Sequence, residues 1–113
     1  MNFNNNVMEK IINFIISKKG EKVTVIDLRG FVYFCDYFVI ANTQNTIHNR
    51  SLAKLLVEEL NKNKIKIHHI EGEKQSEWIL IDCYDIIIHL FLPAVREYYA
   101  IEDLFADLPR WDY

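Results

Sequence analysis

Glycine, proline and cysteine are scarce in this sequence, with three, two and two residues among 113. Half of the residues are apolar, which excludes a disordered or low-complexity chain. The two cysteines, Cys35 and Cys83, are far apart and match neither a metal-binding nor a redox spacing. We therefore expect reduced, structural cysteines in a cytoplasmic protein whose single core needs no disulfide.

Long apolar runs are also missing. No stretch reaches the roughly 18 apolar residues that suggest a membrane span. The first ten residues, MNFNNNVMEK, show neither the basic start and apolar core of a signal peptide nor the arginines of a transit sequence. We expect no membrane partner and a cytoplasmic location.

Positive charge is depleted from the C-terminal part of the chain. Residues 1–70 contain ten Lys or Arg and six Asp or Glu, whereas residues 71–113 contain three basic and ten acidic residues. Phosphates would repel such an acidic surface, so we expect no direct binding to naked RNA or DNA. Two alternatives remain for the carboxylates: scattered solvated groups, or an acidic surface for a basic protein partner.

Apolar periodicity predicts an α/β domain. Helical spacing predicts one helix over residues 7–16, with asparagine caps at 4–6, and a second over about 46–61. Strands are predicted over residues 23–28, 37–41, 64–70, 78–82 and 86–91, and short helical turns from Pro93 to about 104. This order predicts a single-domain α-β sandwich over residues 1–109, with a mixed sheet of about five strands flanked by helices. Residues 110–113 are predicted as a short tail.

Residues 71–91 contain the longest apolar run of the chain, and polar residues such as Asp82, Asp85 and His89 stand at unusual places beside or within apolar segments. They belong to a pattern of three blocks in order along the sequence. The blocks are residues 36–41; then Glu71, Gly72, Glu73, Trp78, Asp82, Asp85, His89, Leu90 and Phe91; then Arg96, Tyr99, Glu102, Leu104, Asp107 and Pro109. Together they resemble the signature of the ribosomal silencing factor family, also called Iojap-related proteins, over residues 7–109.

The resemblance implies both a fold and a function. The implied fold is similar to that of nucleotidyltransferases, without their catalytic motif. The implied function is binding to the large ribosomal subunit through the ribosomal protein numbered fourteen, which keeps the small subunit from joining and represses translation under nutrient limitation. That mechanism is steric and needs no cofactor. An assembly factor for the large subunit is the alternative, and the apolar first helix leaves open a homodimer of the free protein.

The candidate partner surface centres on Trp78. A tryptophan among charged neighbours is typical of an interface anchor. We expect its surroundings to be an acidic and aromatic rim made of Glu71, Glu73, Asp82, Tyr84, Asp85 and Tyr99. Supporting roles are expected for His89, through a hydrogen bond to Asp82 or Asp85, and for Arg96 and Glu102, which would share one helix face with Tyr99 and tie that helix to the sheet.

Tyr84 departs from the family pattern, because it stands where the family usually has glycine. If this position requires a positive φ angle, tyrosine either strains the turn between the two strands or forces a different turn. An exposed Tyr84 would instead add contact area to the partner surface.

Residue spacing supports neither an enzyme nor a metal site. Nucleotidyl transfer needs two carboxylates two residues apart on one strand, and a Gly-Ser turn. Asp82 and Asp85 are three residues apart, and the sequence contains no Gly-Ser pair. The adjacent His68 and His69 are predicted to point to opposite faces of a strand, where they cannot share one ion.

Overall fold

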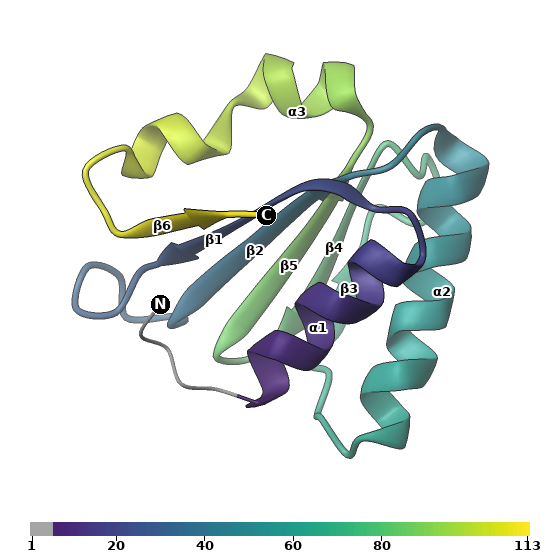
Figure 1. Ribbon diagram of the computed structural model, residues 1–113, viewed down its shortest axis with the longest axis horizontal. Coiled ribbons are helices and arrows are strands. Elements are labelled where there is room, and N and C mark those ends of the chain that lie inside the picture. Colours follow the sequence, from purple (N-terminus) through teal and green to yellow (C-terminus); the bar gives the residue numbers. More distant parts are fainter. Residues whose placement is uncertain (1–5) are drawn as a thin grey trace.

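A computed structural model describes residues 6–113 as a six-stranded mixed sheet with helices on both faces (Figure 1). The elements in chain order are α1 (Asn6–Ser17), β1 (Glu21–Asp27), β2 (Tyr37–Asn42), α2 (Thr46–Lys62), β3 (His69–Glu71), β4 (Trp78–Cys83), β5 (Ile86–Phe91), α3 (Pro93–Tyr99), the 3-10 helix η1 (Ile101–Phe105) and β6 (Arg110–Asp112). The strand order is β3-β4-β5-β2-β1-β6, and only the β2–β5 pair is parallel. The predicted α/β class with a mixed sheet is confirmed.

The main apolar core lies between the sheet and the helices α1 and α2. Met8, Ile11 and Ile15 of α1 are buried there with Leu52 and Leu56 of α2, because a spacing of three and four residues gives each helix one apolar face. The predicted asparagine cap of α1 falls on positions 4–6, of which the first two lie outside the described residues. Among residues 6–113, no helix has the length and apolar character needed to cross a membrane.

The end of α2 explains why residues 64 and 65 are not part of the strand that the alternation of residues 64–70 predicts. The Lys64 N–H donates to the Asn61 carbonyl, and the Ile65 N–H donates to the Leu60 carbonyl at 2.9 Å. Lys64 has a φ of 60°. These bonds and this left-handed residue form a Schellman-type end to the helix, which uses the N–H groups of Lys64 and Ile65. The His68 N–H already bonds to the Asp82 carbonyl of β4, and strand β3 starts at His69.

The residues predicted as a C-terminal tail form the sixth strand. Strand β6 pairs antiparallel with β1, with Trp111 opposite Val25. The Thr24 hydroxyl also donates to the Asp112 carboxylate at 2.7 Å. The aromatic side chain of Trp111 packs on the main core. The C-terminal residues are therefore part of the sheet and not a tail.

Tyr84 does adopt a positive φ angle, of 67°, in the two-residue turn between β4 and β5. Its partner in the turn, Asp85, does not, and a positive φ at only the first position is the pattern of a type II′ hairpin. Glycine is the preferred residue there because a Cβ atom crowds the left-handed backbone.

We predict that Tyr84→Gly unfolds with a free energy about 1 kcal/mol higher than Tyr84→Ala. Neither variant keeps the ring, which packs edge-on against His68 at 5.0 Å, so the comparison isolates the backbone. Urea denaturation of the two variants measures the difference. A more stable alanine variant would contradict the left-handed conformation at this position.

Candidate functional site

The sheet face opposite α1 and α2 is open to solvent over β3 and β4. Alternation along β4 points Trp78, Leu80 and Asp82 to this face, whereas the intervening residues are buried in the main core. His69 and Glu71 of β3 pair with Asp82 and Leu80 and so face the same way. We call this the β3–β4 surface; it comprises His69, Glu71, Trp78, Leu80, Asp82, Tyr84 and Tyr99, all half-buried or exposed.

Trp78 is held rigidly within this surface. Its indole N–H donates to Nδ1 of His89 at 3.1 Å, and its ring lies 4.8 Å from that of Phe91 and 4.9 Å from that of Tyr99. The loop before β4 approaches the backbone of Trp78 closely at Gly72. The φ angle of Gly72 is 88°, and a Cβ added there would lie 1.9 Å from the Trp78 carbonyl oxygen. Only glycine allows this approach, which is why the Glu71-Gly72-Glu73 sequence needs its central residue.

The partner predicted for His89 is wrong. His89 lies opposite Leu80 in the β4–β5 register, with Trp78 on one diagonal and Asp82 on the other. Its Nδ1 accepts from Trp78, while Asp82 turns toward β3. Because Nδ1 accepts this bond, the neutral ring carries its proton on Nε2. Burial, which disfavours the charged ring, lowers the pKa of His89 from its ordinary value near 6.5 to about 3.

His89 should make stability depend on pH in the mildly acidic range. The pKa is lower in the folded state than in the unfolded state, so below about pH 6.5 the unfolded chain takes up a proton that the folded protein does not. Above about pH 6.5 His89 is neutral in both states and does not change stability. Below that pH the free energy of unfolding falls by up to about 1.4 kcal/mol per pH unit toward pH 3. Urea denaturation at pH 7, 5.5 and 4.5 should show a steeper loss for the wild type than for His89→Gln. Equal losses would contradict the buried, neutral histidine.

The acidic residues predicted around Trp78 are only partly brought together. Asp82 and Glu71 lie on the β3–β4 surface, with side chains 18% and 66% exposed. Glu73 lies in the loop before β4 and Asp85 in the turn after it, so these two exposed residues flank opposite ends of the strand. The Asp85 carbonyl accepts from the backbone N–H groups of Asp36 and Tyr37, which fixes the turn against β2.

Arg96 ties α3 to the sheet, as predicted, but not through a shared helix face. Its guanidinium pairs with Glu102 at 2.8 Å and also donates to the Lys22 carbonyl and to the side chains of Asn42 and Thr24. Glu102 belongs to η1, because Ala100 takes a left-handed conformation, with φ 45°, and ends α3. Arg96 therefore supports the helix that carries Tyr99 onto Trp78.

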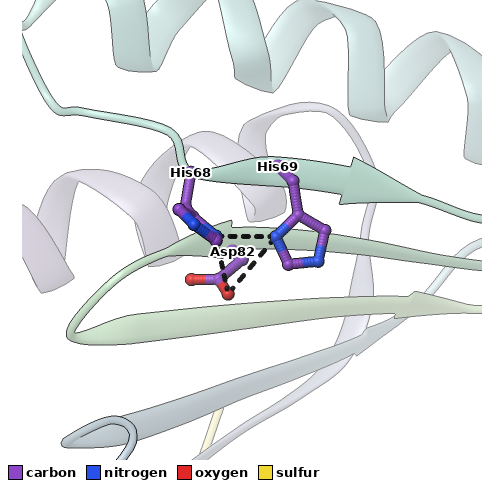
Figure 2. Close-up of side chains that lie close together, drawn as sticks. All are labelled: His68, His69 and Asp82. Atoms are coloured by element: carbon purple, nitrogen blue, oxygen red, sulfur yellow. Dashed lines mark hydrogen bonds and ion pairs between the residues drawn. The ribbon is translucent and has the colours of Figure 1, made fainter.

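Two histidines that the sequence placed on opposite faces lie together beside Asp82 (Figure 2). The Nδ1 atoms of His68 and His69 are 2.8 Å apart, and they lie 3.7 and 3.6 Å from Oδ2 of Asp82. His68 precedes β3, so the alternation of a strand does not apply to it. The His68 backbone N–H donates to the Asp82 carbonyl at 2.7 Å, which holds His68 beside Asp82. The prediction that the two cannot converge on one point is wrong.

The fold and this surface define a small α/β domain. Helices α1 and α2 cover one face of its sheet, whereas α3 and η1 cover only part of the other face, which is exposed, aromatic and acidic over β3 and β4. The chain belongs to the ribosomal silencing factor family: the family model described as "Ribosomal silencing factor during starvation" matches residues 2–113. Membership implies a ribosome-associated role.

Individual relatives agree with this assignment. The sequence is 29% identical to the ribosomal silencing factor of Halalkalibacterium halodurans, over 94% of this chain and 91% of that protein. It is 27% identical to the mouse protein named mitochondrial assembly of ribosomal large subunit protein 1, over 86% of this chain and 44% of that protein. The crystal structure of a Chromobacterium violaceum protein matches with a TM-score of 0.85 and 27% identity, covering 88% of this chain and 83% of that one. A Bacillus halodurans crystal structure matches with a TM-score of 0.80 and 29% identity, over 89% and 94%.

Proposed function

We propose that this protein binds the large ribosomal subunit through the ribosomal protein numbered fourteen and keeps the small subunit from joining. The bound domain occupies space that the small subunit needs, so translation falls under nutrient limitation. The mechanism is steric and needs neither catalysis nor a cofactor. The protein acts in the cytoplasm. The family description, which refers to silencing during starvation, supports nutrient limitation as the condition under which the protein acts.

The observation that carries this proposal is the placement of Trp78 on the open β3–β4 surface beside Asp82 and Glu71. Interfaces are anchored by aromatic residues that are already rigid in the free protein, because little conformational entropy is lost on binding. The indole is fixed by His89, Phe91 and Tyr99 before any partner arrives. The nearby carboxylates suit a basic ribosomal protein and would speed the encounter.

Sedimentation of the purified protein with isolated large or small subunits tests this binding. We expect co-migration with the large subunit alone, and weaker binding as salt is raised, because charge contributes to the contact. Co-migration with neither subunit would contradict the proposal. The free protein run alone reports whether it is a monomer or a homodimer. The apolar face of α1 that suggested a dimer is buried in the core.

A second candidate is an assembly factor for the large subunit. It is favoured by the similarity to the mouse protein whose name refers to assembly of that subunit. Deletion of the gene that encodes the protein distinguishes the two proposed functions. Accumulation of immature large subunits without a change in subunit joining would favour assembly, whereas mature subunits that join more readily would favour silencing.

A further inference from the structure

We propose that His68, His69 and Asp82 form a binding site for a transition-metal ion of the Zn²⁺ class, with a fourth position open to solvent. The separations between the three ligand atoms are 2.8, 3.6 and 3.7 Å (Figure 2). A tetrahedral ion bound at about 2.0–2.2 Å needs ligand atoms roughly 3.3–3.5 Å apart. The three atoms therefore surround one point at nearly the required spacing, and small rotations of exposed imidazole rings complete the fit.

The surrounding hydrogen bonds prepare His69 and Asp82 for a metal. The 2.8 Å contact between the two Nδ1 atoms places a proton on Nδ1 of His68, and this proton moves to the solvent-exposed Nε2 when an ion binds. Nε2 of His69 lies 2.6 Å from a carboxylate oxygen of Glu71, which accepts the Nε2 proton and leaves a lone pair on Nδ1. A carboxylate behind a ligating histidine is the usual second layer of such sites, because it fixes the tautomer and the ring orientation. Oδ1 of Asp82 accepts from the Tyr84 backbone N–H at 2.8 Å, which aims Oδ2 at the two rings.

The donor set decides the class of ion. Two imidazole nitrogens and one carboxylate oxygen favour Zn²⁺, Ni²⁺ or Cu²⁺ over Mg²⁺ and Ca²⁺, which prefer oxygen ligands. The His68 and His69 side chains are 54% and 41% exposed, so an ion can enter from solvent and keep a water ligand. Three protein ligands with one open position is an arrangement known for zinc.

The free protein provides a test that does not depend on ribosome binding, although Asp82 and Glu71 also belong to the β3–β4 surface. Untagged protein is treated with a chelator, dialysed and titrated with Zn²⁺ in a calorimeter. We expect one ion per chain, binding that is lost in His68→Gln and Asp82→Asn, and affinity about 10–100-fold weaker in Glu71→Gln.

His48→Gln is the matched control, because Nδ1 of His48 accepts from the Gln44 backbone N–H and this histidine lies outside the cluster. This variant should bind Zn²⁺ like the wild type. Circular dichroism of each variant checks that the fold is kept. Absence of saturable binding to the wild type, or unchanged binding by correctly folded His68→Gln and Asp82→Asn, would overturn the proposal.

Discussion

Trp78→Ala should weaken binding to the large ribosomal subunit at least about 30-fold, the effect of losing an interface hot spot worth 2 kcal/mol or more. The variant loses the largest rigid apolar side chain of the β3–β4 surface, together with its tilted ring contacts to Phe91 and Tyr99. The measurement is a titration of large subunits with labelled protein. Because part of the indole packs inside the domain, each variant must first show the circular dichroism spectrum of the folded protein.

The matched control is Trp111→Ala. This second tryptophan is also half-buried but lies in β6, at the opposite edge of the sheet from β3. It should lose stability without losing affinity for the subunit. A double charge reversal at Asp82 and Asp85 should weaken binding like Trp78→Ala, whereas the same reversal at the exposed helix residues Glu9 and Glu58 should not. Wild-type affinity in both Trp78→Ala and the Asp82 and Asp85 variant would place the interface elsewhere.

Arg96→Met should lower the free energy of unfolding by about 3 kcal/mol or more. The Arg96 and Glu102 side chains are only 9% and 14% exposed, so removing the guanidinium leaves a carboxylate that water cannot fully solvate. The substitution also removes the donors to the Lys22 carbonyl and to Thr24, two contacts that hold α3 against β1. Urea denaturation measures the change.

Arg110→Met supplies the comparison for this prediction. Arg110 also pairs with a carboxylate, that of Asp112, but the two side chains are 43% and 63% exposed. Exposed ion pairs contribute roughly 0–1 kcal/mol, so this variant should unfold with nearly the wild-type free energy. Similar small losses in both variants would show that the Arg96 network does not hold the terminal helix in place.

Most of the fold could be predicted from the sequence, because its elements follow local periodicity. Runs rich in isoleucine and aromatic residues, bounded by Asp82 and Asp85, identified the central hairpin, and the apolar stripes of α1 and α2 identified the helices over the main core. Strand β6 was missed because it has only three residues after Pro109 and exists through pairing with β1, more than eighty residues away.

The details of the site could not be predicted, because they depend on register and on where each element begins. Whether His89 contacts Trp78 or Asp82 is decided by which diagonal neighbour turns toward it. Whether His68 and His69 diverge depends on β3 starting one residue later than His68. Local alternation does not mark that start, and a one-residue difference changes the face on which a side chain lies.

The most direct test of the proposed silencing is a sucrose-gradient measurement of subunit joining. Purified large subunits are incubated with the wild-type protein or with Trp78→Ala, then mixed with small subunits, and the peak of joined ribosomes is measured. We predict that the wild type reduces this peak and co-migrates with free large subunits, and that Trp78→Ala leaves the peak unchanged. An undiminished peak of joined ribosomes that carries the bound wild-type protein would contradict the steric mechanism.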